Sequence, residues 1–322
     1  MTKFAILALS LVLVACAGGG SEEAGCPAID GREINVVATT PMIGEFVSQV
    51  GGENINLTVL MPPEANPHTY EPAPQDAGTI AEADLVFYTG LLYEPAALVK
   101  LLENSACSTD ILSEVGESVF PIEFKEGGHD DHDDHDDHAG HDHSGTDPHF
   151  FTDPVQMVMV VEALVESLIA NIDGLDAEAI KANGASYVEE LETVNDELQS
   201  MFAALSSDQR VLVTNHQVFG YFALQYDFAV VGTVIPSSST LDSTSAKELA
   251  ELVEVIKENN VKAIFGDVAS SDVLAQTLAA EVGDMKVVPL FTESLGATDT
   301  DASTYLGMLR TNGKLISDSL SG

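Results

Sequence analysis

Three of the nine histidines stand alone in ordered surroundings, where they could bind a metal ion. His68 occurs in PHTYEP, His149 in DPHFFTDP and His216 in TNHQVF, each at or just beyond the expected end of a strand. Ligands of open α/β sheets bind at the carboxyl ends of strands, so we expect these side chains in one crevice. A proline precedes two of them and can fix the backbone of a ligand before binding. A single histidine of this kind is more often structural, and the hypothesis therefore depends on all three.

The other six histidines are concentrated in the tract GGHDDHDDHDDHAGHDHSG, residues 127–145. The tract has almost no apolar side chains and cannot form a core, so we expect a disordered loop. Imidazole suits zinc, copper and nickel, and the aspartates add negative charge, so the loop is expected to bind divalent ions weakly and in variable number. A solvated spacer without a role in binding is the alternative.

The N-terminal residues indicate export. Lys3 precedes an apolar run, Phe4 to Ala15, that is too short to span a bilayer as a helix. The run ends in LVAC, which resembles a bacterial lipobox. That resemblance implies cleavage before Cys16, acylation of its thiol and a location at the outer face of the cytoplasmic membrane. An ordinary secretory signal that happens to contain a cysteine is the alternative.

Two further cysteines, Cys26 and Cys107, remain if Cys16 is acylated. A pair of cysteines in an oxidising compartment is expected to form a disulfide, which would tie the N-terminal segment to the first domain. Two free thiols, or a soft metal site, are the alternatives, but the spacing lacks the CxxC pattern of such sites.

The chain is strongly acidic, with 12 basic and 52 acidic residues and a formal charge of −40 at pH 7. This charge disfavours binding to nucleic acid and to anionic lipid headgroups. It attracts cations only diffusely, and a solvated acidic surface that keeps the protein soluble would explain it equally well. Net charge alone therefore does not predict a metal site.

Short β-branched runs alternate with helical stretches in two regions, which predicts an α/β fold with two lobes and parallel sheets. The expected strands are Ile34–Ala38, Asn56–Met61, Leu85–Thr89, Arg210–Thr214, Ala229–Val234, Lys262–Gly266 and Lys286–Leu290, and the expected helices include Ile43–Val50, Asp76–Ala83 and Ser245–Asn259. Between the regions, apolar residues three or four apart predict one long helix over Asp176–Leu205, about 45 Å long, that connects the lobes. Gly184 weakens this prediction slightly.

The expected organisation has five parts. They are a signal peptide over 1–15, a lipidated tether over 16–33, an N-terminal lobe over 34–175 with the loop 127–145, a linking helix over 176–205 and a C-terminal lobe over 206–322.

Three segments, PHTYEPAPQD, DPHFFTDP and TNHQVFGYFALQY, resemble in that order the signatures of the cluster A-I solute-binding proteins, the zinc and manganese receptors of ABC transporters. The resemblance runs from about residue 35 to residue 312. It implies a metal held between the lobes by His68, His149 and His216, and delivery of that metal to an ABC permease. Glu293 stands where the family usually has a ligating aspartate, and Asp267 and Asp242 are weaker alternatives for the fourth ligand. Phe151 replaces a usual tryptophan and is expected to pack the lobe.

Three neutral imidazoles and one carboxylate form a set that favours Zn²⁺, whereas manganese receptors commonly have a carboxylate where His216 stands. Affinity should fall below about pH 6.5, the ordinary pKa of histidine. Zinc enzymes also use three histidines, but the sequence has no HExxH, GxSxG or Walker motif, so we do not expect an enzyme. We expect a monomeric zinc receptor; a manganese receptor or a surface adhesin are the alternatives.

Overall fold

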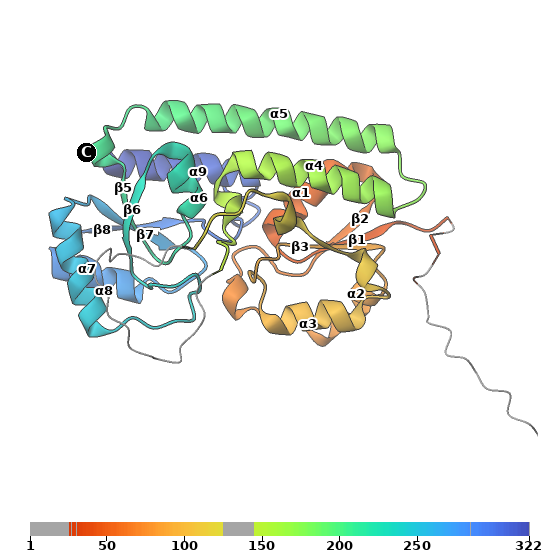
Figure 1. The fold of residues 1–322 in the computed structure, drawn as a ribbon, viewed down its shortest axis with the longest axis horizontal. Coiled ribbons are helices and arrows are strands. Elements are labelled where there is room, and N and C mark those ends of the chain that lie inside the picture. Colours follow the sequence, from red (N-terminus) through yellow and green to blue (C-terminus); the bar gives the residue numbers. More distant parts are fainter. Residues whose placement is uncertain (1–25, 27, 30, 125–144, 284, 322) are drawn as a thin grey trace, which may run out of the picture.

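The computed structural model describes residues 26–321 except for residues 27, 30, 125–144 and 284. The expected signal peptide, the expected lipidation site Cys16 and the six histidines of the tract therefore lie outside the described residues. The described chain forms two lobes side by side, each built on a four-stranded parallel sheet (Figure 1). The predicted α/β fold with two parallel sheets is confirmed.

The strands follow the order β2-β1-β3-β4 in the N-terminal lobe and β6-β5-β7-β8 in the C-terminal lobe. Their bounds are β1 Asn35–Ala38, β2 Asn56–Val59, β3 Leu85–Tyr88, β4 Leu112–Glu114, β5 Val211–Thr214, β6 Ala229–Thr233, β7 Ala263–Asp267 and β8 Lys286–Leu290. All except β4 lie within a residue or two of the ranges expected from their β-branched runs. The strand β4 was not predicted, because its sequence LSE is short and contains a single apolar residue.

Helices cover both faces of each sheet (Figure 1). The helices α1 and α4 of the first lobe and α6 and α9 of the second lie on the side of the long helix α5, whereas α2, α3, α7 and α8 lie on the opposite side. Their bounds are α1 Pro41–Gly51, α2 Pro74–Ala81, α3 Ala96–Ser105, α4 Pro154–Asn171, α5 Ala177–Phe202, α6 Gly220–Tyr226, α7 Ala246–Glu258, α8 Val273–Val282 and α9 Tyr305–Leu320.

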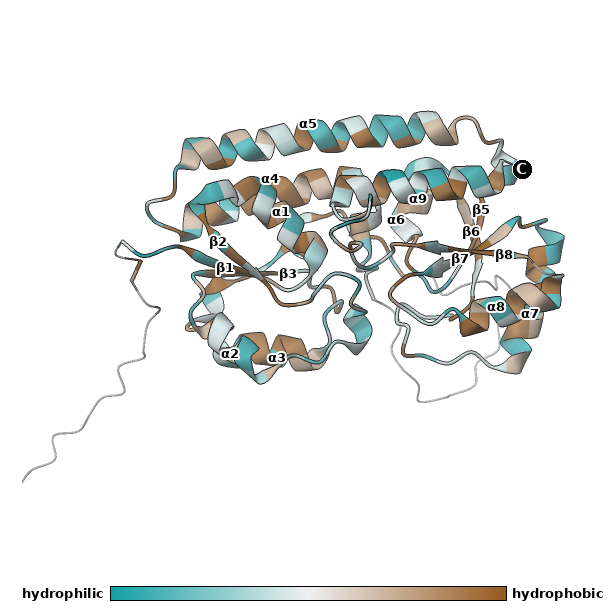
Figure 2. Ribbon diagram, turned by 180° about the vertical axis from the view of Figure 1, so that it is seen from behind, coloured by the Kyte–Doolittle hydropathy of each residue, from teal (hydrophilic) through white to brown (hydrophobic). Residues whose placement is uncertain are grey.

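The helix α5 runs along one side of both lobes, at the top of Figures 1 and 2, and contacts α1, α4 and α9. Its 26 residues correspond to about 39 Å, somewhat less than expected, because the helix ends at Phe202. The Asp176 side chain caps its start by accepting a hydrogen bond from the backbone N–H of Ala179. Gly184 has a packing role, since a Cβ there would lie 2.5 Å from a Val165 methyl group of α4.

The largest hydrophobic core is shared by the two lobes. It includes Phe46 and Leu164 from the first lobe, Leu191 from α5, and Phe265 and Tyr305 from the second. The helix α4 is long and apolar enough to cross a membrane by length and composition, but its buried residues pack into this core. A continuous core of this kind opposes large separation of the lobes.

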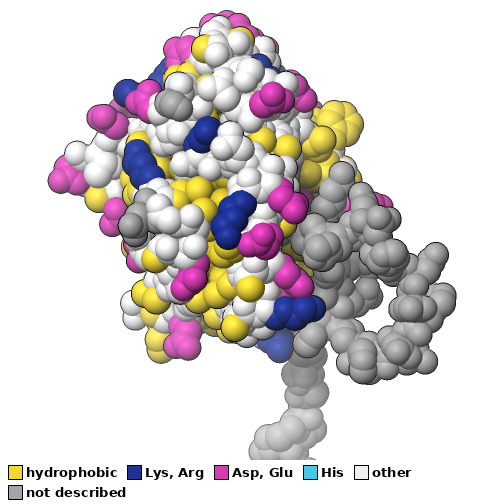
Figure 3. All heavy atoms as spheres, turned by 90° about the vertical axis from the view of Figure 1, so that its left-hand side faces the viewer, with side chains coloured by type: hydrophobic (Ala, Val, Ile, Leu, Met, Phe, Trp, Pro, Cys, Tyr) yellow, Lys and Arg dark blue, Asp and Glu magenta, His cyan; other side chains and the backbone are white. Residues whose placement is uncertain are grey.

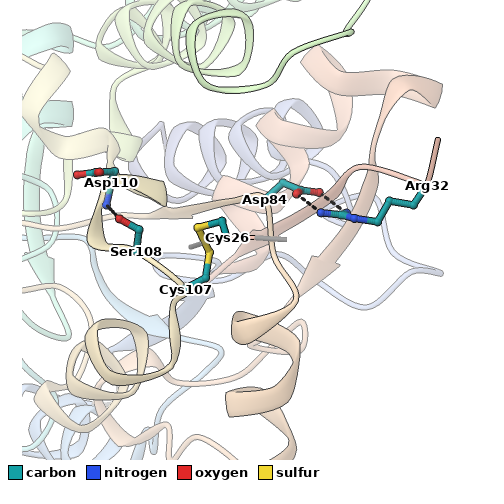
Figure 4. The surroundings of a disulfide bond; sticks show 6 residues. All are labelled: Cys26, Arg32, Asp84, Cys107, Ser108 and Asp110. Carbon is teal, nitrogen blue, oxygen red and sulfur yellow. Dashed lines mark hydrogen bonds and ion pairs between the residues drawn. A yellow bond between two sulfur atoms is a disulfide. The ribbon is translucent and has the colours of Figure 1, made fainter. Parts of the chain in front are cut away.

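The segment before β1 is fastened to the first lobe (Figure 4). Cys26 and Cys107 form a disulfide with their Cα atoms 5.0 Å apart. The guanidinium group of Arg32 donates two hydrogen bonds to the buried carboxylate of Asp84, which also accepts a hydrogen bond from the backbone N–H of Asn35. Cys26 and Arg32 of the expected tether are therefore both bonded to the lobe.

Candidate metal centre

Four side chains meet between the lobes: His68, His149, His216 and Glu293. One potential ligand atom of each lies within 4.8 Å of the others. The Oε1 atom of Glu293 lies 2.7 Å from Nε2 of His68 and 3.4 Å from Nε2 of both His149 and His216. A zinc tetrahedron with bonds of 2.0–2.1 Å has edges of about 3.3 Å, so the four atoms are spaced as ligands of one small ion.

Loops that follow the strands position two of these residues. His216 comes two residues after β5, and Glu293 comes three residues after β8. His68 lies further from its strand, in a short 3₁₀ helix, Pro67–Thr69, where the Asn66 side chain accepts the His68 backbone N–H at 2.9 Å. The sheets thus deliver ligands at their carboxyl ends, as open α/β sheets do.

His149 reaches the site in a different way. Among the described residues, the last strand before it is β4. Thr146, just before His149, forms an isolated antiparallel bridge with Glu123, and His149 stands at the N-cap position of the 3₁₀ helix Phe150–Thr152 without a side-chain capping hydrogen bond. The expectation that every histidine follows a strand end was therefore wrong for His149 and only loosely right for His68. The reason is that these two backbones are shaped by short 3₁₀ turns, which no period in the sequence reveals.

The site is almost completely buried. The side chains of His149, His216 and Glu293 have no exposed surface, and that of His68 is 9% exposed. Among the described residues, neither the Nε2 atoms of the three histidines nor the Glu293 oxygens have a partner with hydrogen-bond geometry. Buried polar groups without partners are costly, and a cation bound by all four residues would satisfy them together.

Charges within the site shift two pKa values. Burial raises the pKa of Glu293, but the charge of His216 and the close polar contacts with all three histidines outweigh burial and hold this pKa well below its usual range. Burial lowers the pKa of His149, but the hydrogen bond and charge of Asp147, with the nearby Glu293, raise it to about 9. The metal-free site therefore pairs a carboxylate with a protonated imidazole, and a metal ion would displace that proton.

The two weaker candidates for the fourth ligand lie outside this group. Asp267 is buried at the end of β7, where burial and the charge of Glu293 raise its pKa. Asp242 is exposed. Phe151 is buried, and its ring lies edge-on to that of His149 with the centroids 5.8 Å apart.

Several contacts close the lobes around the site. The hydroxyl group of Tyr93 in the first lobe donates to the backbone carbonyl of Glu293 in the second, at 3.1 Å. The Asn66 side chain donates to the hydroxyl group of Thr240 at 2.9 Å. A cavity of 340 Å³ lies beside these contacts, and His68 is the one residue of the four that lines it. Exchange of a metal with solvent is therefore expected on the His68 side.

Three residues that support the site were not predicted from the sequence. Asp147 hydrogen-bonds His149, Tyr93 links the lobes at Glu293, and Asn66 caps the turn of His68. Asp147 and Asn66 each stand two residues before a candidate histidine, and an acceptor at that spacing is the signal that could have found them. Tyr93 has no such signal.

The end of the C-terminal lobe carries no acidic patch. Figure 3 shows this face, where acidic and basic side chains are scattered among apolar and neutral ones. No histidine is seen on the part of this face that the described residues form. The charged side chains seen there therefore form a solvated surface.

Known proteins similar to this chain bind zinc or manganese, according to their names. Residues 36–319 match the family described as zinc-uptake complex component A, periplasmic. The chain is 29% identical over 323 residues to the high-affinity zinc uptake system protein ZnuA of Bacillus subtilis, covering 98% of this chain and 96% of that protein. It is 24% identical over 310 residues to the manganese-binding lipoprotein MntA of Halalkalibacterium halodurans, covering 96% and 95%. The solved structure of the periplasmic zinc binding protein TroA from Treponema pallidum matches with a TM-score of 0.76 at 25% identity, covering 89% of this chain and 99% of that one.

Proposed function

The chain belongs to the family of zinc-uptake complex component A, and we propose that it is an extracytoplasmic receptor that binds Zn²⁺ and delivers it to an ABC permease. The observation that carries this proposal is the convergence of three buried imidazoles and one buried carboxylate between two lobes. His68 and His149 come from the first lobe, and His216 and Glu293 come from the second, so a bound ion would cross-link the lobes. Such a cross-link distinguishes the loaded form of the receptor from the empty one.

Zinc is the metal that the donor set favours. Three nitrogen atoms and one oxygen atom suit Zn²⁺, which is borderline-soft and tetrahedral, whereas Mn²⁺ prefers more oxygen ligands. Manganese is the second candidate, because MntA, a relative along most of its length, is named for manganese. Asp267 lies near the site and would have to move to supply a further oxygen.

A receptor fits the site better than an enzyme does. Catalytic zinc sites leave one position open for water, whereas here four protein groups surround one point. The ion is thus the cargo of this protein. Because one chain supplies all four groups, we propose that it acts as a monomer.

We further propose that acylated Cys16 anchors the receptor at the outer face of the cytoplasmic membrane. The lipobox-like LVAC sequence supports this location, and the relative MntA is named as a lipoprotein. The disulfide between Cys26 and Cys107 is a bond typical of oxidising, extracytoplasmic compartments.

The test measures metal content, and competition between zinc and manganese, by mass spectrometry. It uses soluble forms that start at Gly18, one with residues 128–144 and one without them. We expect one tightly held zinc ion. His216→Ala should weaken binding at least 100-fold, whereas the deletion of the tract should change the affinity of this site little. Manganese preference would make the protein a manganese receptor. Equal losses from the two changes, or no bound metal, would reject the ordered site and favour the adhesin alternative.

A further inference from the structure

Asp147 makes two hydrogen bonds to one candidate ligand. Its Oδ1 atom accepts from the backbone N–H of His149 at 2.9 Å and contacts the ring Nδ1 of the same residue at 2.8 Å. The side chains of both residues are buried, that of Asp147 being 6% exposed. Once the ring is neutral, with its remaining proton on Nδ1 and donated to this carboxylate, the other ring nitrogen, Nε2, presents its lone pair to the site.

The carboxylate of Asp147 lies against the second lobe. An ideal Cβ on Gly220, the first residue of α6, would lie 2.3 Å from Asp147 Oδ2. The hydroxyl group of the next residue, Tyr221, donates to the Asp147 carbonyl at 3.2 Å and accepts the Ile122 backbone N–H at 3.2 Å. The position of Asp147 therefore depends on both its own segment and the start of α6.

His216 has no equivalent support. Its Nδ1 atom is buried and has no hydrogen-bond partner among the described residues. A ring without such a partner is held by packing alone, whereas the ring of His149 is fixed by the short hydrogen bond that its Nδ1 donates to a carboxylate. The two lobes thus contribute histidines with different degrees of preorganisation.

We propose that Asp147 is a positioning residue of the metal site, and that Gly220 is glycine because the other lobe must leave room for this carboxylate. The inference rests on the proposed function, because it assigns His149 as a ligand. Contact between α6 and Asp147 then links the orientation of the His149 ring to closure of the lobes. When α6 moves away, the hydrogen bond from Tyr221 is lost and the ring loses part of its support.

The experiment measures zinc affinity of the purified full chain against a chelator that holds free zinc too low to load the histidine tract. Asp147→Ala should weaken zinc binding about 10- to 100-fold, the usual effect of removing a carboxylate behind a histidine ligand. Asp147→Asn keeps an oxygen that can accept from Nδ1, so it should recover most of the loss. Co²⁺ in place of zinc should show a weaker tetrahedral visible spectrum for Asp147→Ala than for Asp147→Asn.

Gly220→Ala tests the second half of the proposal. The added methyl group should displace the carboxylate and lower zinc affinity in the unchanged protein. In the Asp147→Ala background the carboxylate is absent and only the end of the Ile122 side chain, 3.1 Å from the added carbon, must shift, so the further loss of zinc affinity should be small. Gly78→Ala is the matched control, because no atom lies within 4 Å of a Cβ at that position. If Gly220→Ala instead acted independently of Asp147, the losses of zinc affinity caused by Gly220→Ala and Asp147→Ala would add in the double variant.

The outcomes separate this inference from the proposed function. If His149→Ala abolishes tight binding but Asp147→Ala stays within threefold of the unchanged protein, the positioning role is overturned and the receptor proposal stands. Additive losses for Asp147→Ala and Gly220→Ala would also overturn it. If His149→Ala has no effect on zinc affinity, both proposals fail.

Discussion

Glu293→Asp is expected to weaken zinc binding strongly, although the change keeps the carboxylate and removes only one methylene group. The reason is that the backbone around Glu293 is held in place and cannot follow a shorter side chain. On one side of Glu293, the Asn312 side chain makes two hydrogen bonds with the backbone of Phe291, of 3.0 and 2.7 Å. At Glu293 itself, the backbone carbonyl accepts a hydrogen bond of 3.1 Å from the Tyr93 hydroxyl group. On the other side, the backbone N–H of Glu64 donates to Ser294 Oγ at 2.8 Å and to the Leu295 carbonyl at 3.1 Å.

The magnitude follows from these distances. Removing one methylene group withdraws the carboxylate by about 1.5 Å. The separations of 2.7 and 3.4 Å between Glu293 Oε1 and the imidazole nitrogens would then lengthen to as much as about 4.2 and 4.9 Å, well beyond the roughly 3.3 Å edge of a zinc tetrahedron. Zinc sites contribute about 10–16 kcal/mol, so one of four ligands accounts for about 2.5–4 kcal/mol, or about 10²- to 10³-fold in affinity. Water in the vacated position would return part of this, and we expect a loss of about 10- to 100-fold.

The assay is chelator competition for zinc, with Glu293→Ala as the reference for complete loss of the ligand. Glu258→Asp, the same shortening at an exposed position at the end of α7, is the matched control and should leave affinity unchanged. Thermal melts of the metal-free proteins check that each variant folds. If Glu293→Asp binds zinc within threefold of the unchanged protein, either the segment is freely movable or Glu293 is not a ligand. Glu293→Ala decides between these explanations.

Three further changes test other parts of the structure. The pKa of His149 is raised to about 9, so below pH 9 zinc must displace a proton from this ring. Zinc affinity, measured by chelator competition, should therefore rise about tenfold per pH unit from pH 7 to 9, and equal affinities at pH 7 and pH 9 would contradict this. Replacing both Cys26 and Cys107 by serine opens a link across 81 residues and should lower the free energy of unfolding by about 2–4 kcal/mol in urea titrations, with zinc stoichiometry unchanged. Gly184→Ala should lower the free energy of unfolding by about 1–3 kcal/mol, because the added methyl group meets Val165 of α4. The same change at the exposed Gly78 should leave the free energy of unfolding unchanged or raise it, and a larger loss at Gly78 than at Gly184 would refute the close packing of α4 and α5.

The contacts between the lobes affect how a bound metal ion could be released. Hydrogen bonds and a shared core already join the lobes beside the four candidate ligands. A metal ion would add bonds across the same boundary, so release to a permease requires that some of these contacts be broken. The His68 side, where the cavity lies, is the side on which we expect this to begin.

Local patterns in the sequence were sufficient for the α/β class. The β-branched runs predicted β1 and β8 because a strand buried in a parallel sheet is nearly continuously apolar. The apolar spacing in α5 predicted a long helix because one face of it must meet the core. The short strand β4 and the 3₁₀ turns at His68 and His149 have no such period, and only the folded chain shows them.

The sequence by itself singled out three isolated histidines as candidate ligands, and the resemblance to a family added Glu293, with Asp267 and Asp242 as alternatives; this set of donors favours zinc. The tertiary structure decided that these groups meet, because residues far apart along the chain approach only when both sheets and α5 are in place. It also decided how far Glu293 reaches and what holds the His149 ring. Those properties depend on Tyr93 and Asp147, whose partners lie on other elements, and no local pattern specifies such contacts.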